Sequence, residues 1–132
     1  MSASLLYRVA SVLIVLFAAG HQFGFRKVNP AWKAETLVSS MRSLTFDVQG
    51  FTRSYWDFYT GFGLFVTVFL LLAALLAWQL GNPELAKLAR PLAWGLVLAF
   101  AVSTYLSWTY FFIAPLALSS IITVVLIAAA VV

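Results

Sequence analysis

Long apolar runs, separated by more polar segments, dominate the chain. They cover about residues 4–22, 54–80, 91–112 and 115–132. A helix needs roughly 20 mostly apolar residues to cross a membrane, and the last run is near the lower limit of that length. The pattern predicts an all-α fold: a membrane-embedded antiparallel four-helix bundle formed by a single domain of residues 1–132, with both termini on the same side.

The first apolar run has a second interpretation, because Ala18-Ala19-Gly20 resembles a signal-peptide cleavage site. We expect the run to be retained as a helix. Gly20 and Gly24 form a Gly-x-x-x-Gly step on it, which allows another helix to approach closely. In the third run, small residues recur at every fourth position and predict a second close-packing face: Gly95, Ala99, Ser103 and Ser107.

Residues 25–53 form the only long hydrophilic stretch. Asn29-Pro30 is typical of a cap followed by the first helical turn. Apolar residues then repeat at helical spacing between polar ones, at Ala34, Leu37, Val38 and Met41. This pattern predicts a short amphipathic helix lying in the membrane interface between spans one and two. Alternating apolar and polar residues after Leu44 predict an extended segment that ends at Gly50.

Local capping patterns mark where the later helices begin. Ser54 and Asp57 have the spacing of a capping box, although the usual partner is Glu or Gln. Gly81-Asn82-Pro83-Glu84 contains a turn, a cap, a proline and an early acid in that order, so spans two and three should be antiparallel neighbours. We expect Pro91 to interrupt the helix that starts there and Pro115 to start the fourth span.

Composition supports a membrane protein and excludes several kinds of site. The chain is 64% hydrophobic and 9% charged, against about 45–50% and about 25% in soluble domains. The eight basic residues form no run or patch, so the net charge of +4 does not predict nucleic-acid binding. Five of them lie in residues 25–53, which favours a cytoplasmic location for this loop. With no cysteine and one histidine, the sequence shows no metal site, and no cofactor is evident.

Antiparallel crossings bring the end of span one, the start of span two and the end of span three to one membrane face. Their polar side chains, with those of the long loop, are the candidate ligand-binding residues: His21, Gln22, Asp47, Arg53, Tyr55, Asp57, Tyr59, Ser103, Ser107 and Tyr110. Simpler explanations exist for each type. Tyrosines at helix ends are usually interfacial anchors, and His21 can satisfy a loop carbonyl. Asp57 suits a first helical turn and can pair with Arg53, although intramembrane acids are often functional.

Three segments of the chain carry a family resemblance. Gly20-His21-Gln22-Phe23-Gly24-Phe25 closes the first span; Phe46-Asp47-Val48 and Tyr55-Trp56-Asp57-Phe58-Tyr59-x-Gly61-Phe62-Gly63-Leu64 precede and open the second. They resemble a small family of uncharacterised bacterial integral membrane proteins, and the four-span layout is more loosely similar to DoxX-like membrane proteins. The stronger resemblance covers about the first half of the chain. It implies a four-helix bundle in the bacterial inner membrane and transfers no catalytic or binding residue.

Two functions from different classes fit these observations. The first is a non-enzymatic membrane protein that acts as a subunit of a complex or homo-oligomer, or binds a lipid-like or quinone-like ligand at the polar end, with membrane lipids as partners. The second is an interfacial enzyme that uses His21 and Asp57 as acid and base on an amphiphilic substrate. The absence of a nucleophile motif or phosphate-cradling loop favours the first. A transporter is less favoured, because spans two to four have no acid or base near their middle.

Overall fold

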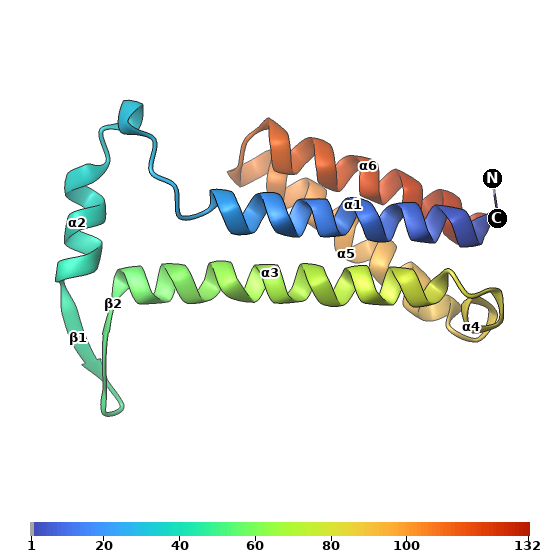
Figure 1. Ribbon diagram of the computed structural model, residues 1–132, viewed down its shortest axis with the longest axis horizontal. Helices are drawn as coiled ribbons and strands as arrows, with labels where there is room; N and C mark the ends of the chain where they lie inside the picture. Colours follow the sequence, from blue (N-terminus) through green and yellow to red (C-terminus); the bar gives the residue numbers. More distant parts are fainter. Residues whose placement is uncertain (1) are drawn as a thin grey trace. The chain divides into compact units, whose positions relative to one another are not determined.

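The computed structural model describes residues 2–132 and confirms the all-α fold (Figure 1). In chain order the elements are α1 (Ala3–Gly24), the 3-10 helix η1 (Pro30–Trp32), α2 (Glu35–Ser43), β1 (Thr45–Val48), β2 (Phe51–Ser54), α3 (Tyr55–Leu80), α4 (Pro83–Leu88), α5 (Arg90–Tyr110) and α6 (Ile113–Val131). Four of the helices, α1, α3, α5 and α6, have the length and composition needed to cross a membrane. Their bounds lie within a few residues of the predicted spans.

The chain divides into two compact units, which are described separately. The helical unit comprises the chain up to Ala18 together with Phe69–Val132, and the polar unit comprises Ala19–Val68. Helices α1 and α3 therefore each contribute one segment to each unit. Five of the eight basic residues belong to the polar unit, as do all the residues between α1 and α3.

The helical unit has one apolar core to which all four long helices contribute. Ile14 of α1, Leu80 of α3, and Ile122 and Leu126 of α6 are among its largest fully buried side chains. Apolar residues occur all round these helices, and the structure selects the face on each that packs against its neighbours. The other faces of these helices carry large exposed apolar side chains.

Hydrogen bonds fix the direction of the α1 and α3 segments in the helical unit. The Ser11 hydroxyl donates to the Ala74 carbonyl over 2.7 Å. Near the start of α1, the Ser4 hydroxyl donates to the carbonyl of Gly81, the residue that follows α3. Because the residue number rises on α1 as it falls on α3, the two segments run antiparallel.

The close-packing face predicted on α5 is wrong for contacts within the helical unit. The buried residues of α5 are Ala93, Leu96, Val97, Phe100 and Ser107, so only the last member of the predicted small-residue row is buried. A side-chain carbon placed on Gly95 would meet no atom within 4 Å. Larger apolar side chains make more dispersion contacts per residue, so a face that carries them packs more favourably within one chain.

The amphipathic helix of the polar unit begins later than the sequence predicts. Asn29 does act as a cap, since its side chain accepts a hydrogen bond of 2.9 Å from the Ala31 amide. It caps only the 3-10 helix, which ends at Trp32 and is followed by Lys33 in a left-handed conformation with φ 51°. A residue in that conformation cannot continue a right-handed helix, so α2 starts at Glu35 instead.

The extended segment after α2 is the first strand of a hairpin, which Figure 1 shows between α2 and α3. β1 and β2 pair antiparallel, with Thr45 opposite Ser54 and Val48 opposite Phe51. The turn residues Gln49 and Gly50 both have positive φ, 51° and 86°. Positive φ at both positions is the requirement of the turn type that matches the twist of a two-residue hairpin. Expecting only one extended segment therefore missed β2, which leads directly into α3.

The predicted capping box at the start of α3 is confirmed. The Ser54 amide donates to Asp57 Oδ2 at 2.8 Å, and the Asp57 amide donates to Ser54 Oγ at 3.2 Å. The Asn82 cap of α4 is also confirmed, because its side chain accepts from the Glu84 amide at 3.1 Å. Pro91 lies in the first turn of α5, where its missing N–H costs no helical hydrogen bond.

Candidate functional site

The two units divide the ten residues predicted to form one site. Seven belong to the polar unit: His21, Gln22, Asp47, Arg53, Tyr55, Asp57 and Tyr59. Three belong to the helical unit: Ser103, Ser107 and Tyr110. Within the helical unit Ser103 donates to the carbonyl of Ala99 one turn earlier over 2.8 Å, so this hydroxyl is satisfied by its own helix. The polar unit therefore holds most of the candidate residues and is described here.

His21 takes part in the junction between the end of α1 and the start of α3. Its Nε2 atom lies 2.9 Å from the Gly63 carbonyl oxygen, which can only accept, so Nε2 carries the proton of this hydrogen bond. The imidazole also stacks on Phe25, with ring centroids 4.9 Å apart and planes 8° apart. Tyr59 completes the junction by donating its hydroxyl to the Phe25 carbonyl.

The same junction requires a residue without a side chain at Gly63. A carbon added there would lie 2.2 Å from the Phe25 ring, far inside van der Waals contact. One turn further along α3, the Thr67 hydroxyl donates to Gln22 Oε1 over 3.0 Å. His21, Gln22 and Tyr59 therefore lie together, and each makes a hydrogen bond that joins α1 or the residue after it to α3.

The two aspartates of the predicted site are both engaged locally. Asp57 accepts from the amide and the hydroxyl of Ser54, at 2.8 and 3.0 Å. Asp47 accepts from the Thr52 hydroxyl across the hairpin, at 2.7 Å. Arg53 makes no ion pair with Asp57 in the described chain. Its guanidinium instead donates to the Thr52 carbonyl at 2.7 Å and lies over the Phe51 ring.

His21 does not line the cavity that borders Asp57. A cavity of about 280 Å³ borders Asp57 and is lined by Arg53, Asp57, Phe58, Gly61, Phe62 and Phe65. The helix position that His21 contacts, Gly63, is six residues beyond Asp57 on α3. Six residues of α-helix span about 9 Å along the axis and place the two positions roughly 120° apart around it. The His21 imidazole therefore contacts α3 on a different face from the one that carries Asp57.

Aromatic rings surround the hairpin and the first turns of α3. Phe46 of β1 lies 5.1 Å from Tyr55 and 5.8 Å from Phe58, measured between ring centroids. Trp56 packs on Tyr59 at 5.4 Å. Tyr55 is 61% exposed. Amphipathic rings at the end of an apolar helix are typical of the boundary between hydrocarbon and headgroups.

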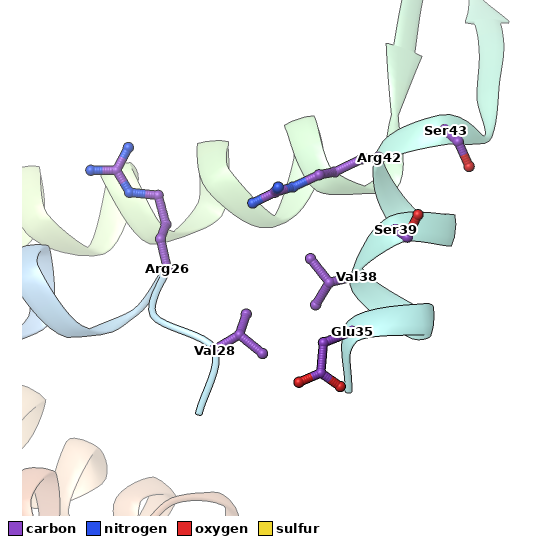
Figure 2. Close-up of a pocket in the computed structure, with 7 residues that line it drawn as sticks. All are labelled: Arg26, Val28, Glu35, Val38, Ser39, Arg42 and Ser43. Atoms are coloured by element: carbon purple, nitrogen blue, oxygen red, sulfur yellow. The ribbon is translucent and has the colours of Figure 1, made fainter. Parts of the chain in front are cut away.

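A larger cavity, of about 600 Å³, lies between α2 and the segment that follows α1 (Figure 2). We call it the arginine cavity; its lining residues are Arg26, Val28, Glu35, Val38, Ser39, Arg42 and Ser43. In Figure 2, Arg42 extends from α2 toward the segment that carries Arg26, and the side chains of Val28 and Val38 face one another. Glu35 lies at the opposite end of the same α2 face from Arg42.

The two guanidinium groups of the arginine cavity are oriented by aromatic rings. Arg42 lies over the Trp56 ring at 4.3 Å, and Arg26 lies over the Phe25 ring at 5.1 Å. Stacking of this kind uses the flat face of a guanidinium and leaves its in-plane N–H donors available. Across residues 2–132, the guanidinium groups of Arg26 and Arg42 form no hydrogen bond or ion pair. The cavity is therefore lined by two guanidinium groups whose N–H donors have no hydrogen-bond partner within the described residues.

The sequence contained part of the evidence for this cavity. Glu35, Ser39 and Arg42 are spaced i, i+4 and i+7, which places them on one face of α2. As the polar residues of an interfacial amphipathic helix, they did not by themselves indicate a shared cavity. Nothing local in the sequence shows that Arg26 and Val28 lie opposite that face, because the 3-10 helix and the turn at Lys33 separate them from α2.

Comparison with known proteins provides no relative from which the role of these residues could be inferred. The chain matches no protein-family model, no curated protein and no solved structure. The resemblance to small bacterial membrane proteins and to DoxX-like proteins therefore stays an expectation from the sequence.

Proposed function

We propose that the chain is a small integral membrane protein that binds the headgroup of a lipid-like amphiphile in its arginine cavity and performs no chemistry on it. The observation that carries this proposal is the pair of guanidinium groups, Arg26 and Arg42, which line one cavity with their donors unused. Arginine donors match the oxygens of phosphate and carboxylate groups in a bidentate way.

The proposal includes membrane embedding as an antiparallel four-helix bundle. Four helices with the length and composition of membrane spans support it, as do the many large apolar side chains left exposed on them. We place the protein in a bacterial inner membrane, with the polar unit on the cytoplasmic side and both termini on one side. The excess of basic residues in the polar unit supports this orientation.

An amphiphile fits the polar unit better than a fully soluble ligand. The cavity volume of about 600 Å³ is within the range of small-molecule sites, about 300–1,000 Å³. Exposed apolar residues in the same part of the chain, Trp32 at 65% and Leu37 at 63%, suit insertion into the headgroup region. In that position the cavity opens where lipid headgroups are most concentrated.

The alternative of an interfacial enzyme is less well supported than lipid binding. Its proposed acid and base are both occupied, since His21 hydrogen-bonds the Gly63 carbonyl and Asp57 caps α3. A role as a subunit of a membrane complex or homo-oligomer is compatible with lipid binding. The uncovered Gly95 and Ala99 face of α5 is available for such contacts.

Lipid retention tests the proposal directly. The protein is extracted in mild detergent and its bound molecules are identified by native mass spectrometry. We expect the wild type to retain a lipid and the double variant Arg26→Ala/Arg42→Ala to lose it. Each hydrogen bond to a charged group contributes about 1.5–3 kcal/mol, so the affinity should fall by about a hundredfold or more.

The matched control removes the same charge elsewhere. Lys27→Ala/Lys87→Ala deletes two basic residues that do not line the cavity, and it should retain the lipid. If the wild type carries no lipid, or if both double variants lose it equally, the arginine cavity is not the binding site.

A further inference from the structure

The arginine cavity contains charges of both signs. Besides its two guanidinium groups it is lined by the carboxylate of Glu35. Across residues 2–132, Glu35 forms no ion pair with Arg26 or Arg42, although all three side chains line the same space. A cavity that keeps opposite charges apart is complementary to a ligand that carries opposite charges at its two ends.

The spacing along α2 defines the size of this charge separation. Glu35 is in the first turn of α2 and Arg42 is in the last. Seven residues of helix correspond to about 10 Å along the axis. Ser39 lies between them on the same face and contributes a hydroxyl, while Val28 and Val38 provide an apolar wall (Figure 2).

The helix dipole explains only part of this arrangement. A negative charge in the first turn and a positive charge in the last are each favoured by the dipole of α2. The dipole does not explain Arg26, which lies outside the helix and brings a second guanidinium to the same cavity. Two guanidinium groups near one end and one carboxylate at the other exceed what α2 needs for its own stability.

We infer that the arginine cavity recognises a phosphate ester that carries a primary ammonium, as in the headgroup of an aminophospholipid. This inference rests on the proposed function and specifies its ligand. Arg26 and Arg42 bind the phosphate oxygens, and Glu35 accepts hydrogen bonds from the ammonium. The apolar wall of Val28 and Val38 contacts the short hydrocarbon link between the two charges.

Two related headgroups fit less well. A headgroup with a phosphate but no amine leaves Glu35 as an unpaired negative charge beside a negative ligand. A quaternary ammonium has no N–H to donate and is typically held by aromatic rings, whereas the cavity wall has no aromatic residue. The expected order of affinity is therefore ethanolamine, then glycerol and choline.

Selectivity between lipids tests the inference. The protein is placed in nanodiscs that contain equal amounts of phosphatidylethanolamine, phosphatidylglycerol and phosphatidylcholine, and bound lipids are counted by native mass spectrometry. We expect the wild type to prefer phosphatidylethanolamine over phosphatidylglycerol by about tenfold, which corresponds to one well-placed charge pair. Glu35→Gln should abolish or reverse this preference while total lipid binding persists. Glu84→Gln, which alters a first-turn acid of α4 outside the cavity, should preserve it.

The outcomes separate this inference from the proposed function. A wild type that binds lipid without preference, or a Glu35→Gln variant with unchanged preference, overturns the headgroup assignment and leaves lipid binding intact. A wild type that retains no lipid overturns both. Soluble phosphoethanolamine should compete only weakly, because it lacks the apolar chains; if it binds as tightly as the lipid, the occupant is a free phosphate ester and the lipid assignment is wrong.

Discussion

The two units of this chain are stabilised in different ways. In the helical unit, large apolar side chains such as Ile14 and Leu126 are completely buried in a shared core. In the polar unit, Ser54 and Gly63 are the only buried residues among those the structure describes, and stability depends on caps, a hairpin and stacked rings. Regions with sparse packing and exposed polar groups are where binding sites usually occur.

The units also differ in how their polar groups are satisfied. In the helical unit, Ser119 is fully buried and donates to the Pro115 carbonyl at 2.7 Å, and Thr123 donates to Ser119 in the same way. Such hydroxyls need no ligand. In the polar unit, Arg26, Arg42 and Glu35 line a cavity with unused donors and acceptors. The number of polar residues in a region is therefore a weaker guide to a binding site than whether those residues already have hydrogen-bond partners.

The largest expected effect concerns the core of the helical unit. Leu126→Ala removes a side chain that is 0% exposed and should lower the free energy of unfolding by about 2–5 kcal/mol. Denaturant titration in detergent micelles measures this loss. Val124→Ala is the control: Val124 is 66% exposed, so its truncation should change stability by about 0.5 kcal/mol or less. Equal losses in both variants would show that the core does not hold the unit together.

An intermediate effect is expected at the junction in the polar unit. Gly63→Ala places a methyl group 2.2 Å from the Phe25 ring, so the ring must leave its stack on His21. Overpacking of this kind costs about 1–3 kcal/mol. Hydrogen exchange of the α3 amides near residue 63 should accelerate.

Gly61→Ala provides a matched comparison for that variant. A methyl group there meets no atom within 4 Å. Alanine is the better helix former by about 0.5–1 kcal/mol, so this variant should be neutral or more stable. Destabilisation by Gly61→Ala, or none by Gly63→Ala, would contradict the described junction.

The smallest effect concerns the start of α3. Asp57→Ala removes the acceptor of two hydrogen bonds from Ser54 and should lower the midpoint of thermal unfolding. Asp57→Asn keeps a side-chain oxygen that can accept and should be nearly silent. Thermal unfolding of the two variants in the same detergent measures the difference. If asparagine costs as much as alanine, the charge of Asp57 has a role beyond capping, and the interfacial-enzyme hypothesis regains support.

The sequence by itself determined the features that depend on neighbouring residues. Apolar runs of sufficient length predict α1, α3, α5 and α6, because helix formation and membrane compatibility are both properties of a continuous segment. The capping box of Ser54 and Asp57 was equally predictable, since its two partners are three residues apart. Features of this kind need no knowledge of what the rest of the chain does.

Only the tertiary structure decided which faces meet. The segment of Arg26 lies opposite α2 and forms the arginine cavity with it, although the 3-10 helix and the left-handed residue Lys33 separate the two in the chain. On α5, packing in the tertiary structure buries Leu96 and Phe100 and leaves most of the small-residue row unburied. In segments that are apolar all round, periodicity does not distinguish one face from another, so contacts between distant residues make the choice.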